Sequence, residues 1–375
     1  MNSSSSLFEN CLIIRLLLGS FLIIPIGCGL FQQPNEPVPG PPPELHIYYG
    51  DLHNHSELSD GLGSAEDAYC YARDVAGLDF FSLADHCYGL NEKDWSEMRA
   101  VADKYNEDGV FTALWGFEWS SGSDENLLYG HCTVTATDDY CTVLDTATDS
   151  FTELRAWLST RDGVAFFNHP NPVLSDSMFN RFSDLPSDKF VGMEVWSMND
   201  KHDWYYYNDG LFPDDNNRSC YDEALARGWK IGATCAGDNH NGTWGTETDC
   251  RMAVLAEDLT RKDILAAIKA RRFYATTDKN IALSFTIDGN EMGSTVTGIS
   301  HTLNVTATDS DDEPFTKAML FNMDHDTVDT WTFDTTCITL SYELTSNAVD
   351  YFYIKITQED RDEAISSPIW IAPVE

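Results

Sequence analysis

Basic residues are scarce in this sequence. Lys and Arg number 23 against 61 Asp and Glu, which leaves a formal net charge of -38. Binding to nucleic acid backbones or anionic lipid headgroups depends on Lys and Arg that displace counterions. The composition therefore argues against non-specific binding to nucleic acid or to an anionic membrane surface.

Long apolar runs are also missing. Residues 16–26 follow Arg15 and contain Gly, Ser and Pro, so this run is too short to cross a bilayer as a helix but fits a signal peptide. The following Ile-Gly-Cys-Gly resembles a lipoprotein processing site. We expect residues 1–28 to be a signal peptide, either lipid-anchored at Cys28 or simply cleaved, and the Pro-rich residues 29–44 to be a stiff linker. The protein would be exported to the periplasm or cell surface, and its only membrane attachment would be the lipid on Cys28 if the segment is a lipoprotein signal.

A Cys-x-x-Cys pair is absent, which argues against a thiolate metal site. Eight cysteines remain after the predicted signal peptide, and an even number in an exported protein favours disulfides. Their connectivity does not follow from the sequence. We expect Cys132 and Cys141 to form a local bridge.

Residues 45–278 alternate short apolar runs with amphipathic stretches of helical length. Strands are expected within 46–55, 78–86, 110–118, 130–136, 163–170, 190–197 and 229–240, and helices within 64–76, 92–105, 152–160, 222–227 and 259–271. Ser64 with Asp67, and Thr152 before Glu153, are typical helix starts. The alternation predicts an α/β domain with a mainly parallel sheet, open or closed into a barrel.

Residues 279–375 have a different pattern. Segments that alternate apolar with polar residues are separated by turns of Gly, Asn, Asp and Ser. This pattern predicts a small C-terminal antiparallel β-sandwich.

Side chains that can bind metals stand at the ends of the expected strands. They are His53, His55, Asp85, His86, Glu118, His169, Glu194, Asp238 and His240, whereas in 130–136 His131 stands at the start. Sites in parallel barrels and open α/β sheets lie at the carboxyl ends of the strands, so one site could collect these residues. His53 and His55 are two apart and point the same way on an extended strand, with Asp60 in the turn beyond. Imidazole with carboxylate suits Zn, Mn and Fe.

The motifs DLHNHSELSDG, LADH, GFE, YGH, NHP and GDNH, in this order, resemble those of the PHP (polymerase and histidinol phosphatase) superfamily of metal-dependent phosphoesterases. The resemblance covers residues 46–277. The exported arrangement with a terminal β-domain ending in SSPIWI is similar to the branch that includes carbaryl-hydrolase-like metallohydrolases. It implies a distorted (β/α)7 barrel of the PHP type over residues 45–278 that binds two or three divalent ions of Zn, Mn or Fe.

The resemblance also implies how the ligands are shared. His53, His55, Glu118 and Asp238 would hold one ion, Asp60, His86 and His240 a second, and His131 and His169 a third, with Glu118 bridging. Asp60 stands where some members have His, which favours Mn or Fe. Three ions would leave a local charge of about +3, which attracts an anion such as the phosphate ester of a small molecule. A metal-bound hydroxide near Glu118 and Asp238 would then attack that ester.

Six further residues are expected around the ligands. Arg251 would hold a phosphate oxygen, or else form a salt bridge. Glu194, Asn199 and His202 would line the substrate pocket, with an exposed loop as the alternative for His202. Asp51 and Asp85 would lie behind the ligands, with Asp51 orienting an imidazole. The histidines at 46, 301 and 325 are expected at the surface.

Two other functions fit the same sequence. The same metal site could hydrolyse the carbonyl group of an aryl ester, carbamate or amide. Alternatively, the protein could be a non-catalytic exported protein that binds a metal or another ligand, with the β-sandwich as a binding module. A proofreading role with a DNA polymerase is disfavoured by the negative charge and the expected export.

Overall fold

The computed structural model describes residues 44–121, 129–171, 179–197, 211–212, 218–346 and 348–373. The expected signal peptide, the linker before residue 44, and both Asn199 and His202 lie outside these ranges. None of the described helices is both long and apolar enough to cross a membrane.

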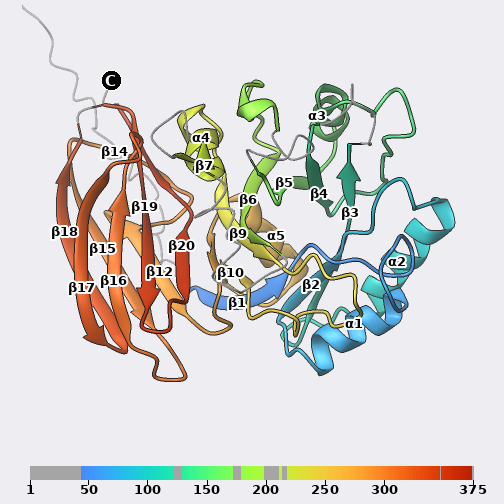
Figure 1. The fold of residues 1–375 in the computed structure, drawn as a ribbon, viewed down its shortest axis with the longest axis horizontal. Coiled ribbons are helices and arrows are strands. Elements are labelled where there is room, and N and C mark those ends of the chain that lie inside the picture. Colours follow the sequence, from blue (N-terminus) through green and yellow to red (C-terminus); the bar gives the residue numbers. More distant parts are fainter. Residues whose placement is uncertain are drawn as a thin grey trace, which may run out of the picture. The chain divides into compact units, whose positions relative to one another are not determined.

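The first part of the chain builds a curled sheet (Figure 1). Its strands are β1 His46–Asp51, β2 Phe80–Leu83, β3 Thr112–Ser120, β4 His131–Thr135, β5 Val164–Asn168, β6 Phe190–Ser197, β9 Gly232–Ala236, β10 Arg251–Ala256 and β11 Phe273–Thr276. They pair in the order β11-β10-β1-β2-β3-β4-β5-β6-β9, and β9 at the far edge lies against β10 and β11. A mixed α/β fold with a curled, half-barrel sheet is compatible with the expected PHP type.

The sheet is less parallel than expected. The pairs β1-β2, β2-β3, β5-β6 and β6-β9 are parallel, but β4 is antiparallel to both of its neighbours. Strands β10 and β11, which the sequence pattern did not reveal, extend the sheet with antiparallel pairing beside β1. Every residue of these two strands is buried, so they lack the alternation of apolar and polar residues that marks a half-exposed strand.

Both faces of the curled sheet are covered by apolar packing. Phe80 of β2 belongs to a core with α5, whereas its neighbour Phe81 belongs to the core with α1 and α2. Successive strand residues point to opposite faces, so a strand buried on both sides has a continuous apolar run. This explains why these strands appear in the sequence as runs such as FFSL and VAFFN.

Five helices occur where amphipathic stretches were expected. They are α1 Ala65–Asp74, α2 Glu92–Tyr105, α3 Phe151–Ser159, α4 Cys220–Ala226 and α5 Arg261–Lys269. The expected capping box of Ser64 and Asp67 begins α1. For α3 the expected cap was wrong: Ser150, not Thr152, accepts the Glu153 N–H, and the Glu153 carboxylate accepts the Ser150 N–H in return. The register of the box follows from the three-residue spacing between cap and acid.

The C-terminal region contains two layers of mostly antiparallel strands. One layer has β12 Ala282–Ile287, β13 Asn290–Glu291, β15 Ser300–Thr308 and β18 Cys337–Thr345, and the other has β14 Thr295–Thr297, β16 Phe315–Phe321, β17 Thr327–Thr335, β19 Asp350–Gln358, β20 Glu363–Ser366 and β21 Ile369–Ala372. Buried residues of both layers, such as Val305 and Ile354, share one core. The separate sandwich domain remains a prediction, because β20 pairs with β11 and so continues the first sheet.

A short two-stranded ladder, β7 Leu211–Phe212 with β8 Arg218–Ser219, precedes α4. Tyr353 of β19 donates a hydrogen bond of 2.7 Å to Asp222 of α4, so α4 is tied to the C-terminal strands. The expected boundary near residue 278 therefore falls within continuous packing.

Two expectations about side chains were wrong. The expected bridge between Cys132 and Cys141 does not form: both thiols are buried and unpaired, and a disulfide joins Cys235, in β9, to Cys250, next to β10. His301 is not at the surface, because it is 1% exposed and its Nδ1 lies 2.6 Å from an Asp288 oxygen.

Candidate metal centre

The strand directions explain why His131 stands at the start of its strand, whereas the other candidate histidines stand after strand ends. His53, His86 and Asp238 follow the carboxyl ends of the parallel strands β1, β2 and β9. His131 begins β4, but β4 runs antiparallel, so its start lies at that same edge, opposite Ser120 of β3. The antiparallel strand thus brings to this edge a side chain that a parallel strand would supply from its end.

Glu118 is the centre of the site. Its side chain is buried, at 1% exposure, and its two oxygens face five imidazoles. The nitrogen-to-oxygen distances are 3.2 Å to His53, 3.8 Å to His55, 2.6 Å to His86, 3.2 Å to His131 and 3.4 Å to His169. The structure therefore brings together the residues expected around a bridging carboxylate.

Asp238 approaches the same histidines from the loop after β9. Its Oδ1 lies 3.1 Å from His55 Nε2 and 3.3 Å from His53 Nε2. The two Nε2 atoms are themselves 3.2 Å apart. Two imidazoles and two buried carboxylates at these distances need a cation or protons between them.

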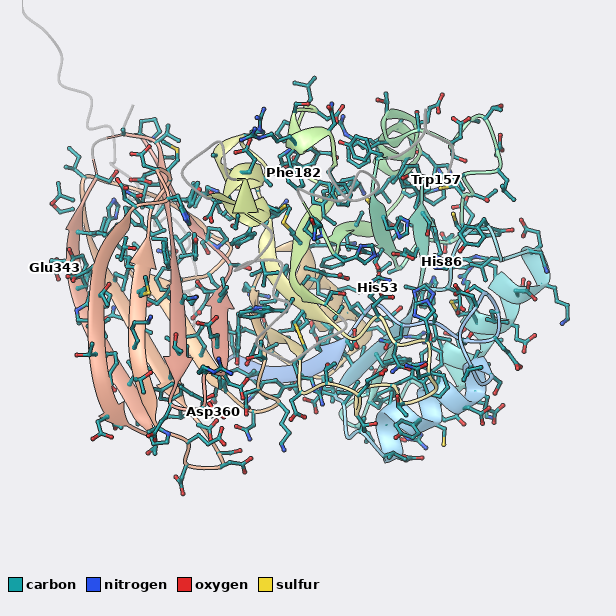
Figure 2. All side chains as sticks on the ribbon, in the orientation of Figure 1. His53, His86, Trp157, Phe182, Glu343 and Asp360 are labelled. Carbon is teal, nitrogen blue, oxygen red and sulfur yellow. A yellow bond between two sulfur atoms is a disulfide. The ribbon has the colours of Figure 1, made fainter. Side chains whose placement is uncertain are left out.

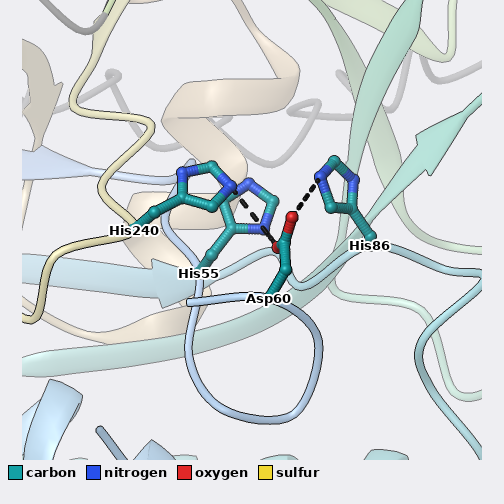
Figure 3. A group of neighbouring side chains, drawn as sticks. All are labelled: His55, Asp60, His86 and His240. Atoms are coloured by element: carbon teal, nitrogen blue, oxygen red, sulfur yellow. Dashed lines mark ion pairs between the residues drawn. The ribbon is translucent and has the colours of Figure 1, made fainter. Parts of the chain in front are cut away.

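Asp60 forms a second group beside the first. Figure 3 shows its carboxylate among the imidazoles of His55, His86 and His240, at 3.7, 3.6 and 3.4 Å. Half of the Asp60 side chain is exposed, whereas the Glu118 side chain is buried, so this group lies on the open side of the site. Potential ligand atoms lie within 4.8 Å of one another in three groups: His55-Asp60-His86-His240, His53-His55-Glu118 and Glu118-His131-His169.

His55 differs from the expected arrangement because it belongs to two groups. Its Nε2 faces Asp238 and His53, while its Nδ1 faces Asp60. The expected split placed His55 with His53 and away from Asp60. In the structure the two nitrogens of the His55 ring face different groups, so His55 could bind an ion in either one.

Electrostatics show that the carboxylates of the site attract positive charge. Burial opposes ionisation of Glu118, but the charges of His131 and His53 hold its pKa well below the ordinary value. Burial also disfavours charge on His169, yet the hydrogen bond to Glu118 and the charge of Asp238 raise its pKa to about 9. Burial lowers the pKa of His55 to about 4. Without metal ions, protons on some imidazoles supply the positive charge that the buried acids require.

Two expected ligands have an unusual backbone. His169 has φ 30° and Asp238 has φ 45°, a region that residues other than glycine rarely adopt. Hydrogen bonds hold both peptides there: the His169 N–H donates to Glu194 at 2.8 Å, and the Asp238 N–H donates to the His53 carbonyl at 2.8 Å. Such backbone strain clusters at functional sites, where it directs a side chain.

Glu194 has a different place from the one expected. It does not line an open pocket, because it is 1% exposed and both of its oxygens are engaged. One accepts from His53 Nδ1 at 2.7 Å and the other from the His169 N–H. Glu194 thereby fixes the His53 ring and leaves His53 Nε2 facing Glu118 and Asp238.

Asp51 and Asp85 support the backbone rather than an imidazole. Asp51 accepts from the His53 N–H at 3.1 Å and from the Gly237 N–H at 2.9 Å, so it joins the loops after β1 and β9. Asp85 accepts from the N–H of Ser56 and from the hydroxyls of Ser56 and Ser59, which orders the turn before Asp60. Burial raises the pKa of both carboxyls to about 6.

Arg251 is engaged with the backbone of its own loop, and these contacts do not support its expected role as a phosphate ligand. The residue is 5% exposed, and its guanidinium donates to three backbone carbonyls, those of Thr248, Cys250 and Gly245, at 2.7 to 3.0 Å. Peptide oxygens thus take both N–H groups of Nη1 and one of Nη2. Arg251 instead holds together the loop between Asp238 and β10.

Three residues of the site were not expected. Asn168 donates to Glu118 at 2.8 Å, Ser120 Oγ lies 2.6 Å from His86 Nδ1, and the half-exposed Tyr88 ring stacks on the His86 ring at 4.9 Å. Asn168 stands beside His169 at the end of a strand, which could have marked it. Ser120 and Tyr88 have no distinctive sequence pattern.

The donor set fits divalent metal ions. Six imidazoles and three carboxylates meet, and these are the ligands that Zn, Mn and Fe take in proteins. The described residues thus contain a cluster of His, Asp and Glu that could bind more than one metal ion.

Comparisons with known proteins give distant similarities. Residues 79–165 match DUF3604, a family described as a protein of unknown function. Uncharacterized proteins of Chlamydia pneumoniae and Chlamydia muridarum are each 22% identical over 94% and 87% of this chain, and the chain covers only 60% and 57% of their length.

Two solved structures are also similar. One is a two-domain protein from Bacteroides vulgatus described as containing a predicted PHP-like metal-dependent phosphoesterase, with 15% identity, TM-score 0.47, and coverage of 90% of this chain and 99% of that one. Another, from Bifidobacterium adolescentis, is described as a candidate metal-dependent phosphoesterase, with 17% identity, TM-score 0.32, and coverage of 52% and 88%. None of these matches by itself assigns the chain to a family.

Proposed function

We propose that the protein is a metal-dependent hydrolase that cleaves a phosphate ester of a small molecule. The observation that supports this most directly is the convergence of buried Glu118 and Asp238 with the surrounding imidazoles. A structural zinc site needs four ligands, whereas this cluster offers eight residues in three groups, with Asp238 as a ninth beside them. His55 belongs to the first and second groups, and Glu118 belongs to the second and third. Shared ligands are typical of sites with adjacent ions that act on one substrate.

The proposed ligands are the nine residues expected from the sequence. They are His53, His55, Asp60, His86, Glu118, His131, His169, Asp238 and His240. Divalent ions held there would lower the pKa of water and stabilise the negative charge that develops on phosphoryl oxygens. We also infer that the curled sheet is the distorted (β/α)7 barrel of the PHP type.

The chain itself prepares the site for this chemistry. Glu194 fixes the tautomer of His53, and Asn168 fixes the orientation of Glu118. Two or three divalent ions exceed the charge of Asp60, Glu118 and Asp238, so the loaded site would attract an anion even though the chain carries a net charge of -38. A phosphate ester is such an anion, which favours it over a neutral carbonyl ester.

Hydrolysis by the metal-loaded protein tests the proposal. We expect cleavage of p-nitrophenyl phosphate or its diester, inhibition by inorganic phosphate, and loss of both activity and bound metal in His53→Ala and Asp238→Ala. Cleavage of an aryl ester or carbamate alone would replace the phosphoesterase with the carbonyl hydrolase. A protein that binds no metal would instead support the non-catalytic binding protein.

We also propose that the protein is exported, with Cys28 as a lipid anchor. The Cys235-Cys250 disulfide supports an oxidising compartment, because disulfides persist mainly outside the cytosol. Expression with Cys28→Ser should release the protein from the membrane fraction without preventing its export. Retention of both the wild type and Cys28→Ser in the cytosol would contradict the proposal.

A further inference from the structure

A second group of acids lies where three loops of the C-terminal region meet. It consists of Asp278, Asp309, Glu313, Asp360 and Asp362, which follow β11, β15 and β19. Carboxylate oxygens lie within 4.8 Å of one another in two triplets, Asp278-Asp309-Glu313 and Glu313-Asp360-Asp362. Figure 2 shows Asp360 well apart from His53 and His86 of the candidate metal centre. We call these five residues the junction cluster.

The described residues provide no counter-charge for the junction cluster. Across the described ranges, no Lys, Arg or His nitrogen lies within 4.0 Å of any of its carboxylates. Asp278 and Asp309 are nevertheless only 8% and 7% exposed. Burial together with the charges of Asp360 and Asp278 raises the pKa of Asp362 to about 7. Buried carboxylates without a counter-charge are costly, so the arrangement requires protons or a cation.

The backbone holds these carboxylates in place. Asp278 Oδ1 accepts from the N–H groups of Asn280 and Ile281, and Asp309 Oδ1 accepts from those of Asp311 and Glu313. These bonds shape each loop around its own acid. The second oxygen of Asp278 and the carboxylate of Glu313 have no hydrogen bond from the described residues, so they remain free to bind an ion.

An independent observation is the amide of Gln358. Gln358 is 1% exposed, and its Nε2 donates to Asp309 Oδ2 at 2.9 Å, which places the carboxamide at the cluster. Its Oε1 is buried and meets no hydrogen-bond donor among the residues that the structure describes. A buried carbonyl oxygen normally has a partner, so this one lacks the group that would satisfy it. Amide carbonyls and carboxylates together are typical calcium ligands.

We propose that the junction cluster and the Gln358 carboxamide bind a calcium ion that links the loop after β11 to the loops after β15 and β19. The donors are oxygens, without His or Cys, which suits a hard cation rather than Zn or Fe. Calcium takes six to eight oxygens in flexible geometry, whereas magnesium demands a near-ideal octahedron that three separate loops do not easily provide. The ion would fasten the β11-β20 junction, where the first sheet continues into the C-terminal strands.

Calcium titration of the full chain tests the proposal. The protein is first freed of metal with a chelator, and binding of calcium alone is measured by calorimetry and by the shift in unfolding temperature. Glu313→Gln should weaken calcium binding at least tenfold, because Glu313 belongs to both triplets. Asp312→Asn removes one charge from an exposed neighbour outside the cluster, and it should leave calcium affinity near the wild-type value.

Two further variants keep the test decisive. His53→Ala removes a ligand of the candidate metal centre and should not change calcium affinity, so a calcium response lost in His53→Ala would overturn the proposal. Asp360→Asn, at an exposed position, replaces Glu313→Gln if that variant fails to fold. Equal calcium affinity of wild type and both cluster variants, or no binding at millimolar calcium, would also overturn it.

Discussion

Glu194→Gln distinguishes a residue that orients a ligand from one that contacts substrate. Glu194 accepts two hydrogen bonds, from His53 Nδ1 at 2.7 Å and from the His169 N–H at 2.8 Å. Glutamine keeps the size of the side chain but has only one carbonyl oxygen, so one donor would face an NH2 group. A hydrogen bond to a charged group contributes about 1.5–3 kcal/mol, and its loss would weaken metal binding about 10- to 100-fold.

The assay is competition between the protein and a chelator for Mn or Zn, combined with hydrolysis rates at increasing metal concentration. We expect Glu194→Gln to need more metal and to recover most of its kcat when metal is in excess. Glu57→Gln, an exposed acid in the loop before Asp60, is the matched control. Unchanged metal affinity with a raised KM would refute this reasoning and would return Glu194 to the substrate pocket.

Three further predictions concern stability. Cys235→Ser opens a disulfide with a sequence separation of 15 and should lower the free energy of unfolding in urea by about 3 kcal/mol, whereas Cys337→Ser, at an exposed unpaired cysteine, should have little effect. Arg251→Lys cannot span three carbonyls and should cost about 1–3 kcal/mol with KM near wild type; a raised KM at unchanged stability would restore its role as a phosphate ligand. In calcium-free protein, the raised pKa of Asp362 means that the folded state keeps its proton longer than the unfolded chain, so stability should fall as pH rises from about 4 to about 7. In urea unfolding, the free energy of unfolding of Asp362→Asn relative to wild type should therefore increase between about pH 4 and about pH 7. Parallel pH profiles of the two proteins would contradict the prediction.

Sequence patterns were sufficient to predict features that depend on residues close together in the chain. Ser64 with Asp67 marked the start of α1, because a cap and its acid are three residues apart. The alternation of apolar runs and amphipathic stretches located the helices and most strands of the curled sheet. His53 and His55 at the end of β1 were marked by their spacing alone.

Long-range pairing was decided by the tertiary structure. The sequence showed His131 at the start of a strand, but only the antiparallel pairing of β4 brings it to Glu118. The buried strands β10 and β11 have no alternation that would reveal them, and their place beside β1 and β20 depends on pairing with residues far along the chain.

The sequence by itself determined which residues could form the candidate metal centre, because imidazoles and carboxylates at strand ends define the available chemistry. The tertiary structure decided their roles. It engaged Glu194 with His53 and Arg251 with backbone carbonyls, and it joined Cys235 to Cys250. Hydrogen-bond partners and disulfides depend on distances between residues remote in sequence, and only the folded chain sets those distances.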